Sequence, residues 1–170
     1  MRNMLVCVLL VCASGCAARQ AQMAVQTSLT AMAEGVDSSA LIVIERYPEA
    51  AAEARARIVT QVQAGALSAT RALEAYDASV AGWNAALFSL EVARDVLRSG
   101  QAALDVWVDS GEVPGSWEGF CDDVEVAIVR VLDTFETCGL TPPEALRSAA
   151  RYSADVCQLT ANFFSPRGAR

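Results

Sequence analysis

The chain has 170 residues, of which 54% are hydrophobic, and it carries 20 acidic side chains against 13 basic ones. Every basic residue is Arg, because the sequence contains neither Lys nor His. This composition excludes an imidazole base, a Ser-His-Asp triad, a His-ligated metal and a lysine Schiff base. The net charge of −7, with Arg scattered singly, also argues against a nucleic-acid surface. We therefore expect no enzyme, no cofactor, no metal and no nucleic-acid partner.

The first sixteen residues have the pattern of an export signal. Arg2 supplies a positive start, and residues 4–12 form an apolar run that is too short to span a bilayer as a mature helix. Residues 13–16 then read Ala-Ser-Gly-Cys. This ending resembles the lipobox of bacterial lipoproteins, although Ala13 stands where Leu is usual. The alternative is an ordinary cleaved signal followed by an incidental Cys.

The resemblance implies that Cys16 receives diacylglycerol and becomes the new N-terminus after cleavage. Two or three acyl chains hold a protein to a membrane durably, whereas one chain does not. Cys16 is followed by Ala17 rather than by the Asp that marks inner-membrane retention. In a host with two membranes, the resemblance therefore implies a palmitate-type anchor in the outer membrane, with the mature domain facing the periplasm. The expected segments are a signal peptide (1–15), a lipid-anchored linker (16–19), a helical bundle domain (20–165) and a C-terminal tail (166–170).

Apolar residues at alternating steps of three and four predict helices along the mature chain. The first helix is expected over residues 20–47, ended by Pro48, which cannot donate to the hydrogen-bond ladder. The strongest stripe covers residues 70–109. Two arrangements remain open before it: a turn around Gly65, or one long, kinked helix over residues 49–109. The second is slightly favoured, because a single Gly among small polar residues is a weak stop signal.

Two shorter helices follow a loop that contains Pro114. The buried stripe expected for residues 116–138 consists of Cys121, Val124, Ile128, Val131, Phe135 and Cys138. Gly139 ends this helix, and the last helix starts within residues 141–144, whose Thr-Pro-Pro-Glu sequence is typical of a helix N-terminus. No period-two alternation indicates a strand. The sequence therefore predicts an all-α, elongated antiparallel bundle of about four helices, with the second helix long and, in the favoured arrangement, kinked.

Three cysteines of the bundle lie on the last two predicted helices. If these helices form an antiparallel pair, Cys121 and Cys157 lie almost equally far from the turn near Gly139. Cys138 lies beside that turn, about 25 Å of helix away from either. An exported compartment permits a disulfide, so we predict a Cys121–Cys157 bond and an unpaired Cys138. The alternative is three buried, reduced thiols.

The loop between the second and third predicted helices is flanked by acidic residues. They are Asp109, Glu112, Glu118, Asp122, Asp123 and Glu125. Such a group would suit a calcium ion or a carboxylate pair, but acidic residues are also favoured in the first turn of a helix, and the twelve-residue calcium-loop spacing is absent. We therefore expect a solvated acidic face.

The tryptophans divide between the core and the loop. Trp83 lies on the central stripe and is expected to pack in the core. Trp107 and Trp117 flank the loop, where they either cap the end of the bundle or form an exposed interaction site. Arg94 and Gln101 occupy seam positions of the central helix, where polar residues more often set helix register than bind a substrate.

Three functional interpretations follow. The first is a membrane-anchored periplasmic lipoprotein with a non-enzymatic structural or protein-interaction role in the cell envelope, and with an envelope protein as its partner. The second is a bundle that binds a lipid or small apolar ligand between its helices. The third is a bacteriophage-encoded envelope lipoprotein that acts in lysis or superinfection exclusion.

Overall fold

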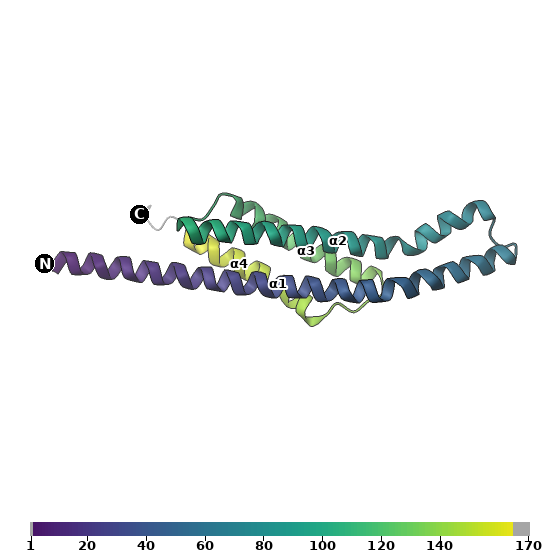
Figure 1. Cartoon of the computed structure of the whole chain (residues 1–170), viewed down its shortest axis with the longest axis horizontal. Helices are drawn as coiled ribbons and strands as arrows, with labels where there is room; N and C mark the ends of the chain where they lie inside the picture. Colours follow the sequence, from purple (N-terminus) through teal and green to yellow (C-terminus); the bar gives the residue numbers. More distant parts are fainter. Residues whose placement is uncertain (1, 165–170) are drawn as a thin grey trace.

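The described residues form four helices in a computed structural model of the chain (Figure 1). The structure describes the backbone of residues 2–164 and the side chains of residues 17–158, 160 and 161. The helices are α1 (Arg2–Gln63), α2 (Ala69–Ser110), α3 (Ser116–Thr137) and α4 (Glu144–Phe164). No strand occurs within the described residues. The predicted all-α bundle is therefore confirmed.

The helices pack in an antiparallel ring in which each helix contacts two neighbours. The contacting pairs are α1 with α2, α2 with α3, α3 with α4, and α4 with α1. Figure 1 shows that the shorter α3 and α4 cover only part of the long hairpin made by α1 and α2. Residues 48–81 contribute no side chain to the core cluster of the bundle, and we call them the projecting hairpin. The molecule is therefore a four-helix bundle with a two-helix extension.

The core of the bundle is drawn from all four helices. Its largest fully buried side chains are Val25, Met32, Val36, Val43, Leu90, Leu104, Val124, Ile128, Val131, Phe135, Leu146 and Val156. Within each helix these residues lie near steps of three and four, as one face of a helix requires. The projecting hairpin has three buried side chains of its own, Ala54, Ile58 and Val80, which do not belong to this core.

The predicted end of the first helix at Tyr47 is wrong, because α1 continues through Pro48. Proline removes one hydrogen bond, to the carbonyl four residues earlier, here that of Ile44. Ile44 and Pro48 are both exposed, so water can satisfy that carbonyl. Packing on both sides of the proline, at Val43 and Ala54, holds the helix together. A solvent-facing proline between two packed turns is therefore tolerated.

The long helix favoured for residues 49–109 is also wrong, because the chain reverses after Gln63. Gly65 adopts a positive φ of 70°. Its amide donates to the carbonyl of Val62 at 3.0 Å, and the amide of Ala66 donates to that of Gln61 at 2.9 Å. This pair of bonds is a Schellman cap, which satisfies the last carbonyls of a helix with glycine in the left-handed position. The helix therefore ends in a cap built on this single glycine.

Gly35 lets the backbones of α1 and α4 approach closely. A Cβ atom at this position would lie 2.8 Å from the carbonyl oxygen of Ala145 and 3.2 Å from the amide nitrogen of Leu146, at the start of α4. Both are backbone atoms, so relief would require α4 to move as a whole. The glycine therefore fixes the spacing of the two helices.

Gly35→Ala should lower the free energy of unfolding by about 1–3 kcal/mol, the usual range for an overpacked core. Urea unfolding followed by circular dichroism measures the change. Gly119→Ala is the matched control, because Gly119 is a helical glycine of α3 whose Cβ would meet nothing within 4 Å. The control should raise stability by about 0.5–1 kcal/mol, since alanine is the better helix former. Equal responses of the two variants would contradict the close approach.

Candidate functional site

The predicted lipidation site, Cys16, lies outside the described side chains, so its modification stays a prediction. Its backbone belongs to α1, and so do residues 16–19, which were expected to form a linker. The first buried core residues after it are Ala21 and Val25. At 1.5 Å per residue, the helix enters the bundle about 8 Å beyond Cys16. Within the part of the chain that the structure describes, no helix has the length and apolar character to cross a membrane.

The predicted cysteine pair is confirmed as a pair at disulfide distance. Cys121 of α3 and Cys157 of α4 have Cα atoms 5.6 Å apart, and their sulfur atoms are at bonding distance. Their separation of 36 residues is divided nearly equally by the turn at Gly139. Gly139 ends α3, as predicted, and has a positive φ of 69°. The position of this turn determines the register between α3 and α4. The register in turn determines which cysteines face each other.

Trp107 and Trp117 are buried at the end of the bundle, so the alternative in which they are exposed is wrong, and they cap the bundle's end. Each is only 3% exposed, and their rings meet edge to face with centroids 6.2 Å apart. The buried stripe of α2 runs through Leu97, Gly100, Leu104 and Trp107 instead of through Gln101 and Val108. Gly100 can occupy a buried position because the ring of Phe120 fills the space that a Cβ would need. Aromatic bulk from α3 thus replaces the side chain that α2 lacks.

Hydrogen bonds link α1 with α2, and α3 with α4, at this end of the bundle, which we call the loop end. Gln22 of α1 donates its side-chain amide to the carbonyl of Trp107 at 3.2 Å. The indole N–H of Trp117 donates to the hydroxyl of Thr160 in α4 at 3.0 Å. Buried polar groups are costly unless they are paired, so the bond to Thr160 allows the indole of Trp117 to be buried beside a loop.

A pocket of about 410 Å³ opens at the loop end. Its lining residues are Val113, Pro114, Gly115, Trp117, Glu118, Cys121, Cys157, Thr160 and Ala161. Of these described lining residues, Glu118 alone carries a charge. The register that pairs Cys121 with Cys157 also places Trp117 beside Thr160. Both lie about one helical turn farther from the turn at Gly139 than the cysteines do. The cysteine pattern could therefore have located this pocket in the sequence, although we did not predict it.

The acidic residues near the loop are spread over an exposed surface. Glu118, Asp122, Asp123 and Glu125 are all exposed on α3. Among the described residues, no group of three or more His, Cys, Asp or Glu side chains is arranged to hold a metal ion. Glu118 lies in the first turn of α3, where the helix dipole favours a carboxylate.

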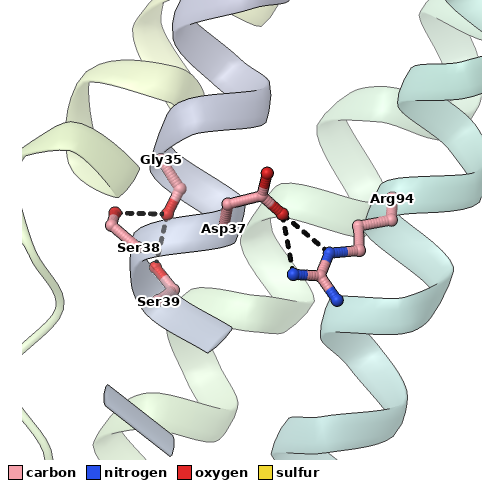
Figure 2. A network of polar contacts seen from close by, with 5 residues as sticks. All are labelled: Gly35, Asp37, Ser38, Ser39 and Arg94. Atoms are coloured by element: carbon pink, nitrogen blue, oxygen red, sulfur yellow. Dashed lines mark hydrogen bonds and ion pairs between the residues drawn. The ribbon is translucent and has the colours of Figure 1, made fainter. Parts of the chain in front are cut away.

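An ion pair crosses the outer face between α1 and α2. Figure 2 shows the guanidinium of Arg94 reaching across to Asp37. Nε of Arg94 donates to Oδ1 of Asp37 at 2.8 Å, and a terminal nitrogen lies 2.7 Å from the same oxygen. On the other side of α1, the hydroxyls of Ser38 and Ser39 donate to the carbonyl of Gly35 (Figure 2). Arg94 thus links neighbouring helices through an exposed contact, and its role in helix register stays a prediction.

Reversing both charges, as Asp37→Arg with Arg94→Asp, should preserve most of the stability that either single reversal loses. The expected coupling is about 0.2–1 kcal/mol, because the two side chains are 62% and 43% exposed and water screens exposed pairs strongly. A double-mutant cycle by urea unfolding measures it, and 1 M salt should reduce it. The Asp95 and Arg98 pair, within one helix, is the control. Coupling above about 2 kcal/mol would contradict a solvated pair.

Cys138 lies half-buried at the C-terminal end of α3, where it is the free thiol among the described residues. Burial raises the pKa of this thiol. A raised pKa disfavours the thiolate, which is the nucleophilic form. The position at the negative end of a helix disfavours the thiolate further. Cys138 therefore behaves as a small hydrophobic residue and not as a reactive thiol.

The structure brings Trp117, Cys121 and Cys157 together at one pocket and places Trp107 behind them in the core. It separates Cys138 from this group at the opposite end of α3. Family models, curated proteins and solved structures were each compared with the chain, and none of the three comparisons gives a match.

Proposed function

We propose that this protein is a periplasmic lipoprotein, anchored to the outer membrane through Cys16, with a structural or protein-interaction role in the cell envelope and no catalytic turnover. The observation that carries the proposal is the continuity of α1. The helix passes without interruption from the backbone of Cys16 through the bundle and into the projecting hairpin. An anchor at Cys16 would therefore be coupled rigidly to the far end of the molecule.

The length of α1 gives the proposed anchor a mechanical consequence. From residue 17 to its end at Gln63, the helix spans about 70 Å at 1.5 Å per residue. A flexible tether would let the bundle lie at any angle to the membrane, whereas a continuous helix favours a fixed spacing between the membrane and the hairpin tip. The architecture is thus suited to holding a contact surface at a distance from the membrane.

The projecting hairpin is the natural contact region, because α3 and α4 do not cover it (Figure 1). Leu73 is 67% exposed and Val59 is 47% exposed on its two helices. When a partner covers exposed aliphatic side chains, the removal of their apolar surface from water lowers the free energy of the complex. We propose that this partner is another protein of the envelope.

The non-enzymatic part of the proposal rests on the absence of His and Lys side chains that could act as a general base. A hydroxyl such as that of Ser110 or Ser116 needs a general base, and the sequence supplies no His or Lys for that purpose. Cys138 has a raised pKa, caused by burial, and is therefore a poor nucleophile at neutral pH. These groups have simpler structural roles at helix ends.

Photo-crosslinking in living cells tests the interaction role. A photoreactive phenylalanine analogue in place of Leu73 should give one discrete adduct with an envelope protein. The same analogue at Val126 of α3 is the matched control, because Val126 is also an exposed aliphatic residue, at 58%, but lies on the bundle. Adducts of equal yield from both positions would indicate random collision. Adducts from Val126 alone would place the interface on the bundle and contradict the role of the hairpin.

A further inference from the structure

We propose that the loop-end pocket binds one acyl chain of a membrane phospholipid. The inference rests on the proposed function, because it takes the membrane at the anchored end of α1 as the source of the chain. It assigns a ligand to a pocket formed by α3, α4 and the loop between α2 and α3. The chemistry of the lining, the charge at the pocket and its position in the molecule each support this ligand.

The lining suits hydrocarbon more than a polar ligand. Val113, Pro114 and Ala161 contribute aliphatic surface, and Trp117 contributes an aromatic face. The polar atoms here are already paired, since the indole N–H of Trp117 donates to Thr160. Among the described residues, no buried side-chain nitrogen or oxygen lacks a hydrogen-bond partner. A polar ligand would gain few bonds here, whereas each methylene that leaves water strengthens binding about fourfold.

The charge at the pocket distinguishes a lipid from a free fatty acid. Glu118 is the charged residue among the described lining, and Asp122 lies one turn further along the same helix. The carboxylate of a free fatty acid would be repelled by these side chains. An acyl chain that is esterified in a phospholipid carries no charge at its carbonyl end. The pocket therefore favours the esterified chain.

The position of the pocket identifies the membrane as the source of that chain. Trp117 in the pocket wall packs against Trp107, whose carbonyl accepts a hydrogen bond from Gln22. Gln22 lies six residues after Cys16 in the same helix, which corresponds to about 9 Å along the axis. Figure 1 shows the loop between α2 and α3 and the end of α4 at the end of the bundle from which the first part of α1 extends. An anchor at Cys16 would therefore hold the pocket against the lipid surface.

Heavy-atom quenching of tryptophan fluorescence tests the proposal with the full, lipidated protein in vesicles. The vesicles contain phosphatidylcholine whose acyl chains are brominated at their midpoint, so that bromine in the bilayer interior stays away from a protein outside it. A chain that enters the pocket brings bromine to Trp117. Wild-type emission should fall relative to unbrominated vesicles, and Trp117→Phe should lose most of this quenching. Quenching that is unchanged in Trp117→Phe would overturn the proposal.

A pocket-filling variant and its control complete the test. Ala161→Leu places a larger side chain in the pocket and should reduce quenching to the level of Trp117→Phe. Ala102→Leu, on the exposed face of α2, should be quenched like the wild type.

Flotation of each variant with vesicles reports membrane attachment separately from quenching. Failure of the wild type to float with the vesicles would contradict the anchor. Normal flotation without quenching overturns the pocket proposal alone. Strong quenching by a soluble brominated alcohol, with none by the phospholipid, would overturn the membrane as the source.

Discussion

Replacing Cys16 by Ser should move almost all of the protein from the membrane fraction to the soluble fraction and abolish incorporation of labelled palmitate. The sulfur atom of Cys16 is the proposed point of attachment of diacylglycerol, and a serine hydroxyl does not replace it. Anchoring by two or more acyl chains is durable, while a protein without them has only weak surface contacts. The expected change is therefore close to complete. Fractionation of labelled cells, followed by immunoblotting, measures both effects.

Cys138→Ser is the matched control for this experiment, because it also removes one free thiol. This variant should remain in the membrane fraction with unchanged palmitate incorporation. If Cys16→Ser incorporated as much palmitate as the wild type, the anchor would have to be elsewhere in the chain. If the wild type incorporated none, the proposed lipoprotein would be an ordinary exported protein.

Removal of the Cys121–Cys157 bond should lower the free energy of unfolding by about 3–4 kcal/mol, according to the loop-entropy estimate for a loop of this size. The bond closes a loop of 36 residues that contains the turn between α3 and α4. Without it, the unfolded chain gains conformational freedom while the packed helices remain the same. The double variant Cys121→Ser with Cys157→Ser, unfolded in urea without reductant, measures the loss.

Two controls separate the bond from the thiols. The wild type in excess reductant should resemble the double variant, and Cys138→Ser should change stability by no more than about 1 kcal/mol, since it exchanges one small side chain for another. Peptide mapping without reduction should show Cys121 joined to Cys157. A bridge from Cys138 to either of the others would contradict the register of α3 and α4.

Elements with strong local signals could be predicted from the sequence. The central helix was expected to end at residue 109, and α2 ends at Ser110. The third helix was expected over residues 116–138 and is observed as Ser116–Thr137. Glycine and proline in the loop between these two helices mark both of these positions. Where such signals agree, local sequence is sufficient to place a helix.

Two helix boundaries depended on context that the sequence does not show. Pro48 normally ends a helix, but its effect depends on whether the carbonyl it leaves unpaired can reach water. Gly65 stands alone among small residues, and its effect depends on whether two helices can pack against each other after a reversal. Here the reversal allows Ala54 and Ile58 to be buried against α2. Tertiary packing thus decided both cases.

The candidate site was predicted in part. Cys121 and Cys157 were paired correctly, because only the turn position was needed. Trp107 was left off the predicted buried stripe because the stripe was extended through Gln101, one residue away from the buried Gly100. A glycine carries no apolar side chain, so a pattern of apolar residues cannot show that it faces the core. The complementary ring of Phe120 comes from another helix.

The mass of one tryptic peptide tests the lipoprotein proposal most directly. Trypsin cleaves after Arg2 and Arg19, and the chain contains no basic residue between them. The account predicts a peptide that begins at Cys16, ends at Arg19 and carries the added mass of two or three acyl chains. An unmodified peptide from residue 3 to Arg19, or one that begins at Cys16 without acyl mass, would contradict it.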